Sequence, residues 1–101
     1  MSANEPPIVQ IATVRAAEGD EDALAGALAQ VVAPSREEPG VIAYEISRSA
    51  DDPRTFLIYE VYESREAVKT HNKTEHVQRL GASEQVGRAR FDVARYRRLD
   101  P

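Results

Sequence analysis

Glu60 and His71 are the residues of this sequence whose types and surroundings best suit a reaction centre. Glu60 stands in an apolar and aromatic run, Phe56–Tyr62, where a buried carboxylate must be paired or hydrogen-bonded. His71 follows eleven positions later. Histidine is the side chain whose ordinary pKa lies near neutral pH, so a buried histidine can act as a general base.

The sequence does not decide whether Glu60 pairs with His71 or with an arginine. His71 lies at i+4 from Ala67 and i+3 from Val68, which directs it toward the sheet on a covering helix. A Glu60–His71 pair would orient the imidazole and raise its basicity. The alternatives are a salt bridge from Glu60 to an arginine of a neighbouring strand, and a packed His71 satisfied by another acceptor.

Tyrosine side chains beside this pair could donate a hydrogen bond to a substrate oxygen. Alternatively, their rings simply pack in the core with the hydroxyl groups at its edge. By strand alternation Tyr62 shares a face with Glu60, and Tyr44 belongs to the preceding strand. We therefore predict a substrate pocket with polar groups from Tyr44 and Tyr62 and apolar walls from Ile42 and Ile58.

The sequence predicts no metal site. His71 and His76 are five residues apart, which puts them about 140° apart around a helix, so we expect that they cannot share a metal as i, i+4 ligands would. His71 and Glu75 have the i, i+4 spacing, but two ligands do not make a site. The chain has no cysteine, so disulfides, thiolate catalysis and cysteine-ligated metals are excluded.

Hydrophobic periodicity and turn residues place these side chains in a β-α-β-β-α-β order. Strands are expected over four segments: Ile8–Arg15, Val41–Arg48, Thr55–Tyr62 and Arg88–Leu99. Helices are expected over three segments. The first is Leu24–Val32, with a bend or a short extra turn at Pro34; the second runs from the N-cap candidate Ser64 to about Asn72, and the third from the N-cap candidate Thr74 to about Val86. The order predicts an α+β, ferredoxin-like fold whose antiparallel sheet has helices on one face only. The other face carries apolar residues that need a cover, so we expect a homodimer; the alternative is a monomer whose open face is half polar.

Length and charge restrict the function further. The chain has 101 residues, which fits one domain over residues 8–99 after a disordered lead over residues 1–7. A net charge of −4 disfavours nucleic-acid binding. No apolar run approaches the roughly 18 residues of a membrane span, and the N-terminus lacks a signal-peptide pattern. We expect a cytoplasmic protein.

Three stretches resemble the antibiotic biosynthesis monooxygenase domain family: Val32–Gly40 with its E-P-G end, Phe56–Tyr62 with Tyr59-Glu60, and the helical pair Ala67 and His71. The resemblance runs from about Ile8 to Leu99. It implies a dimeric α+β barrel with a pocket in each subunit between sheet and helices. Well-studied members oxidise polycyclic phenols or hydroquinones with molecular oxygen and use no metal, flavin or haem.

The resemblance also implies roles for the candidate residues. His71 would be the base, Glu60 its orienting carboxylate, and Tyr44 or Tyr62 the donors to the substrate anion in a dry cavity. No cofactor is expected, and the small-molecule partner would be an aromatic substrate. The alternative function is a non-catalytic small-molecule binding protein, or an isomerase-like protein, on the same scaffold.

Overall fold

The computed structural model describes residues 5–100, which form four strands and five helices. In chain order the elements are β1 (Ile8–Arg15), α1 (Glu21–Ala29), α2 (Val32–Arg36), β2 (Val41–Arg48), β3 (Thr55–Tyr62), α3 (Arg65–Asn72), α4 (Glu75–Gly81), α5 (Glu84–Arg88) and β4 (Arg90–Arg97). Residues 1–4 of the predicted N-terminal lead lie outside the described range. No helix in residues 5–100 has the length and apolarity that crossing a bilayer requires.

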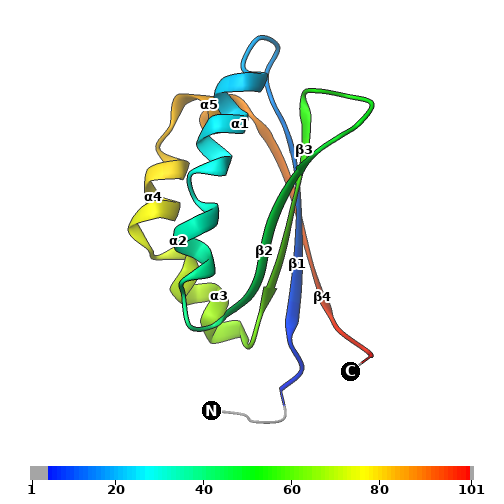
Figure 1. The fold of residues 1–101 in the computed structure, drawn as a ribbon, viewed down its shortest axis with the longest axis vertical. Helices are drawn as coiled ribbons and strands as arrows, with labels where there is room; N and C mark the ends of the chain where they lie inside the picture. Colours follow the sequence, from blue (N-terminus) through cyan, green and yellow to red (C-terminus); the bar gives the residue numbers. More distant parts are fainter. Residues whose placement is uncertain (1–4, 101) are drawn as a thin grey trace.

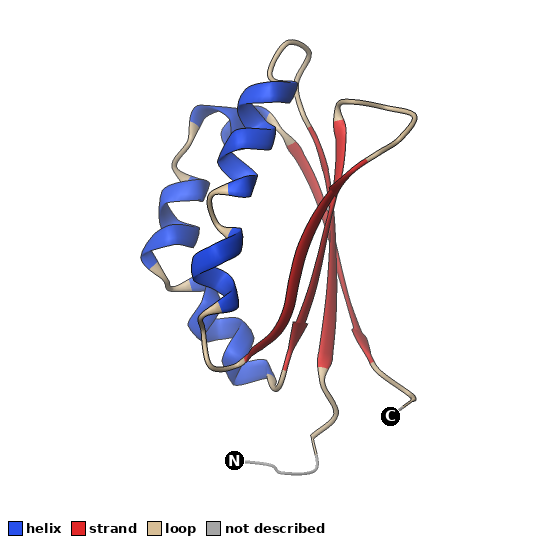
Figure 2. Cartoon of the chain, viewed as in Figure 1, coloured by secondary structure: helices blue, strands red, loops and turns tan. Residues whose placement is uncertain are grey.

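The sheet is antiparallel throughout, with strand order β2-β3-β1-β4. All five helices cover one face of it, as Figure 1 and Figure 2 show. This confirms the predicted ferredoxin-like α+β fold. β3 lies between β2 and β1, which explains why its sequence is apolar on both faces.

Two predicted helices are each divided in the structure. The first divides into α1 and α2, and Pro34 lies in the first turn of α2, where its missing N–H leaves no hydrogen bond unmade. The last divides into α4 and α5 because the Ser83 hydroxyl accepts from the Val86 N–H and begins a new helix. Arg88 therefore ends α5, and β4 runs over Arg90–Arg97 rather than the predicted 88–99.

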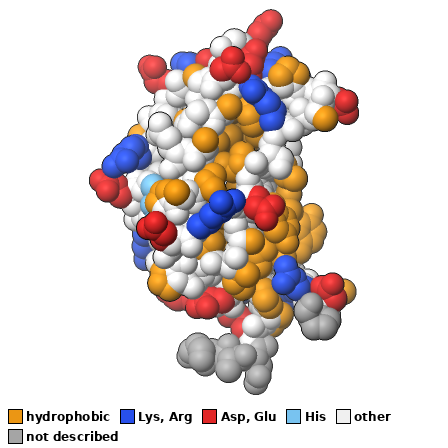
Figure 3. Space-filling model, viewed as in Figure 1, with side chains coloured by type: hydrophobic (Ala, Val, Ile, Leu, Met, Phe, Trp, Pro, Cys, Tyr) orange, Lys and Arg blue, Asp and Glu red, His pale blue; other side chains and the backbone are white. Residues whose placement is uncertain are grey.

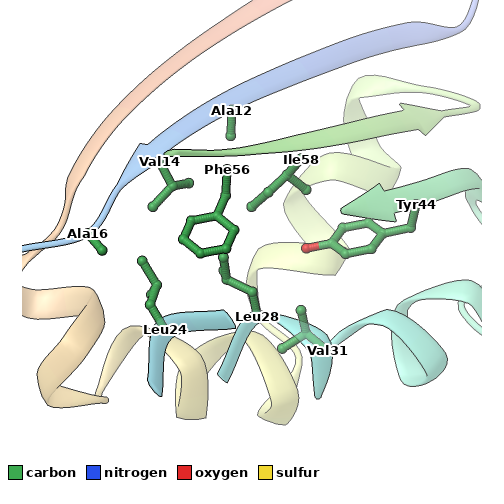
Figure 4. Packing of buried hydrophobic residues seen from close by; sticks show 9 residues of the cluster. All are labelled: Ala12, Val14, Ala16, Leu24, Leu28, Val31, Tyr44, Phe56 and Ile58. Carbon is green, nitrogen blue, oxygen red and sulfur yellow. The ribbon is translucent and has the colours of Figure 1, made fainter. Parts of the chain in front are cut away.

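The main core lies between α1 and the helix-covered face of the sheet. Leu24 and Leu28 of α1 are fully buried against residues such as Val14 and Phe56. Val14 and Phe56 are direct partners in the β1–β3 register, so their side chains point to the same face. Figure 4 shows this cluster, with Tyr44 at one end of it.

The opposite face and the β4 edge carry apolar side chains that the helices do not cover. All eight residues of β4 are exposed, and Tyr96 is 56% exposed. Figure 3 shows hydrophobic side chains gathered over the sheet side of the molecule. Tyr96 pairs with Val9 in the register, which places it on the face away from Glu60.

Candidate functional site

His71 lies in the last turn of α3 and is only 3% exposed. The Ser64 hydroxyl accepts from the Ala67 N–H and sets where this helix begins. From that start, Val68 and His71 fall on the buried face, as the spacing predicted. The Thr74 hydroxyl donates to the His71 carbonyl at 2.7 Å and fixes the turn that follows.

The carboxylate beside His71 is Glu38, not Glu60. The His71 Nδ1 atom lies 3.0 Å from Oε2 and 3.2 Å from Oε1 of Glu38. Glu38 belongs to the loop between α2 and β2, where its N–H donates to the Ser35 carbonyl. The E-P-G motif that ends the stretch Val32–Gly40 therefore supplies a site residue. A carboxylate next to a glycine turn, before a helical histidine, was the signal that could have identified it.

His76 completes the cluster, because its Nε2 atom lies 2.7 Å from the same Oε2 atom of Glu38. α3 ends at Asn72 and α4 begins at Glu75, so the chain turns between the two histidines. Their ring centroids are 6.0 Å apart. The expectation that His71 and His76 cannot converge is therefore wrong, because the 140° spacing holds only for one unbroken helix.

Glu60 is buried at the centre of the sheet with neutral partners. It accepts hydrogen bonds from the Gln10 amide at 3.0 Å and from the Tyr62 hydroxyl. Arg95 donates to the Gln10 oxygen at 2.7 Å and is linked to Glu60 through that side chain, but it lies on β4, which is not next to β3, so this is not the predicted direct salt bridge. The register places Gln10 opposite both Glu60 and Arg95. Burial raises the pKa of Glu60 above its usual value.

Tyr44 and Tyr62 pack against the imidazole of His71. Their ring centroids lie 5.3 and 5.4 Å from that of His71. Burial, followed by the charge of Glu60, raises the pKa of both phenols well above the usual range. Both hydroxyls therefore stay protonated near neutral pH and can serve as hydrogen-bond donors but not as bases.

The structure thus brings four of the six predicted site residues together, from β2, β3 and α3: Glu60, His71, Tyr44 and Tyr62. The two isoleucines lie outside this cluster. Ile58 is part of the main core, whereas Ile42 is 55% exposed. A register irregularity between Val41 and Ala43 interrupts the β2–β3 pairing at Ile42.

Two cavities border the cluster on different sides. A cleft of about 930 Å³ lies between the start of β2 and α3, and Glu38, Ile42 and Thr70 contribute to its walls. A smaller cavity of about 120 Å³ is lined by His76 and Leu80, among others. Glu38 is therefore the residue that connects the larger cleft to His71.

Gly40 allows this close arrangement of loop and helix. A Cβ atom at position 40 would lie 2.5 Å from the Ala67 Cβ atom of α3. The Gly40 carbonyl also accepts from the Glu63 N–H at 2.9 Å. The absent side chain thus lets the Glu38 loop lie directly against the helix that carries His71.

Comparison with known proteins gives consistent results for fold and family. Residues 7–82 match the family model described as antibiotic biosynthesis monooxygenase. That segment contains Glu38, Glu60, His71 and His76. No protein with a curated description matches the sequence.

Several solved structures have the same fold along their whole length. PA3566 from Pseudomonas aeruginosa is 29% identical, with a TM-score of 0.91 and coverage of 98% of this chain and 100% of that one. Rv0793 from Mycobacterium tuberculosis is 28% identical, with a TM-score of 0.85 and coverage of 94% and 97%. A candidate antibiotic biosynthesis monooxygenase from Nitrosomonas europaea is 25% identical, with a TM-score of 0.87 and coverage of 100% and 98%.

Proposed function

Because this chain belongs to the antibiotic biosynthesis monooxygenase family, we propose that it is a monooxygenase that oxidises a phenolic or hydroquinone-type aromatic with molecular oxygen. Family membership supports the reaction class. The observation that carries the substrate class is the Glu38–His71 contact at the wall of the cleft. A carboxylate and an imidazole in hydrogen-bond contact can remove a phenolic proton, which is the step that makes such a substrate reactive toward oxygen.

In this proposal Glu38, which borders the cleft, takes the phenolic proton and passes it to His71, the base that holds it. The side chain of Glu38 is 12% exposed, whereas that of His71 is 4% exposed. His76 holds the same Glu38 oxygen from the other side. The carboxylate is thereby fixed between two imidazoles, which limits how far it must move when a proton arrives.

Glu60 has a supporting role in the same proposal. It accepts from the Tyr62 hydroxyl, so that phenol is already engaged. Tyr44 is therefore the donor that we assign to the oxygen of the substrate anion, with its ring against His71. Ile42 supplies apolar contact in the cleft, and Ile58 supports the core behind Tyr44.

The proposed reaction balances without an external reductant. For a phenol with a free para carbon, phenol and O₂ give a para-quinone and water. The Glu38–His71 pair removes the phenolic proton, the anion transfers electrons to oxygen, and a C–O bond forms at the para carbon. Loss of water from the resulting hydroperoxide forms the second carbonyl group. One oxygen atom stays in the product, and the substrate provides all the electrons that reduce O₂.

Oxygen uptake with a panel of anthrones and hydroquinones tests this function. We expect at least one compound to consume O₂ with the protein present, and His71→Ala to abolish the enhancement. Full activity of the variant would show that the base is wrong. No uptake above the uncatalysed rate with any compound would contradict the substrate class.

A second candidate function is binding without turnover. It is favoured by the burial of the cluster, in which His71, Glu60 and Tyr62 are almost fully enclosed. Saturable binding of the same aromatics, with unchanged ligand recovered, would support this function over oxidation.

We also propose that two copies of the chain pair through the open face of the sheet. Leu57 is 40% and Tyr96 56% exposed there, and burial of such side chains is favourable. Pairing would also close the β4 side of the domain, which the helices leave uncovered.

A further inference from the structure

Glu38, His71 and His76 direct three potential metal-ligand atoms toward one point, and we propose that they bind a divalent transition-metal ion of the Zn²⁺ type. The atoms are Oε2 of Glu38, Nδ1 of His71 and Nε2 of His76, and all lie within 4.8 Å of one another. Two imidazoles and one carboxylate form a common donor set for Zn²⁺ and its neighbours, with a fourth position left for water.

The distances in the cluster are close to those that a metal would impose. Oε2 of Glu38 lies 3.0 Å from Nδ1 of His71 and 2.7 Å from Nε2 of His76. A tetrahedral ion with bonds of about 2.0–2.1 Å separates its ligand atoms by about 3.3 Å. The two pairs that include Glu38 Oε2 need to separate by only a few tenths of an ångström in place of the hydrogen bonds, and the two imidazole nitrogens lie within 4.8 Å of one another.

The three side chains are held by different parts of the chain. Glu38 is fixed through its N–H to Ser35 and by the close approach of Gly40 to α3. The Thr74 hydroxyl bonds to the His71 carbonyl and caps the helix that carries His76. Because the backbone positions are set by folding, metal binding need not order them.

Access and surroundings also suit an ion. Glu38 borders the larger cleft and His76 the smaller cavity, so the cluster can be reached from two sides. The rings of Tyr44 and Tyr62 flank His71 and exclude water from its inner side. An apolar surround of this kind strengthens metal–ligand attraction.

The metal site goes beyond the proposed oxidation and does not depend on it. A bound ion would occupy Nδ1 of His71 and the carboxylate of Glu38, the same atoms that the proton transfer uses. The two uses therefore exclude one another in one molecule. Binding is measured without any aromatic substrate, so its failure and the failure of the oxidation are separate results.

Isothermal titration of the full chain with Zn²⁺ alone, after removal of metals with a chelator, tests the site. We expect one ion per chain. Glu38→Gln and His76→Asn each remove a proposed ligand. Losing a residue that only hydrogen-bonds a ligand lowers metal affinity by roughly 10- to 100-fold, so these two variants should each lower Zn²⁺ affinity by more than that. The matched control is Glu75→Gln, an exposed carboxylate beside His76 that pairs with Arg79 and should leave binding unchanged.

A measurement on the unaltered protein keeps the test valid if a variant fails to fold. The chain has two histidines, and both lie in the cluster. With Co²⁺ as the probe, the imidazole signals of both should shift or broaden together in NMR spectra, with a tetrahedral visible absorption. Absence of saturable Zn²⁺ binding, or imidazole signals that Co²⁺ leaves unchanged, would overturn the proposal and leave the trio as a hydrogen-bonded cluster.

Discussion

The Nδ1 atom of His71 lies 3.0 Å from Oε2 of Glu38, a residue 33 positions earlier in the chain. The contact joins the loop before β2 to the end of α3. It makes Glu38 the link between the buried imidazole and the large cleft. Both the proposed oxidation and the proposed metal site depend on this pair.

Replacing Glu38 by glutamine should lower the rate of oxygen uptake by about 100- to 10,000-fold, because the amide keeps the shape but cannot take up a proton. Steady-state oxygen consumption with the best aromatic of the panel measures this. Glu75→Gln changes a carboxylate outside the cluster and should retain the rate of the unaltered protein. Equal losses in both variants would mean that Glu38 has no special role.

Glu60→Gln should change how stability depends on pH. Burial raises the folded-state pKa of Glu60 above the unfolded value of 4.5, so its protonated form favours folding. That contribution is fully present below pH 4.5 and is lost as the pH rises through the folded pKa. Four groups face Glu60 and lower its pKa against the effect of burial. Tyr62 and Gln10 do so by hydrogen bonds to the carboxylate, and His71 and Arg95 by their charge.

Urea unfolding of both proteins at a series of pH values checks this expectation. The free energy of unfolding of Glu60→Gln, relative to the unaltered protein, should increase as the pH rises from 4 upward. Curves that run parallel over the whole range would contradict a raised pKa for Glu60.

Gly40→Ala should destabilise the protein by about 1–3 kcal/mol, because the new methyl group meets Ala67 with no space to relax. Thermal or urea unfolding measures the loss. Gly26 is the matched control, since it lies in α1 with no atom within 4 Å of an added Cβ. Gly26→Ala should stabilise by about 0.5–1 kcal/mol through helix propensity. A stable Gly40→Ala variant would show that the loop does not depend on this close approach.

Tyr96→Glu should convert a dimer to a monomer, because it places a charge on the open sheet face where the two copies would meet. Light scattering coupled to size-exclusion chromatography gives the mass directly. Leu99→Glu is the control, since Leu99 is 99% exposed beyond the end of β4. If the unaltered protein elutes as a monomer at all concentrations, the pairing proposal is wrong.

Much of the fold could be predicted from short-range patterns in the sequence. The bounds of β1, β2 and β3 agree with the predicted strands, because alternation of apolar residues is a local property of an extended chain. The Ser64 and Thr74 caps were also predicted, since a hydroxyl finds its N–H partner three residues away. The missed cap was Ser83, which divides the last helical region in two.

The sequence by itself determined that Glu60 and His71 are buried among aromatic residues, since periodicity sets which face of a strand or helix a side chain occupies. It did not determine their partners. Glu38 and His76 join His71 only when the loop before β2 packs against α3 and the chain turns between α3 and α4. Gln10 reaches both Glu60 and Arg95 only through the register of three strands. Contacts over 33 to 85 positions depend on how whole elements pack, which only the tertiary structure decides.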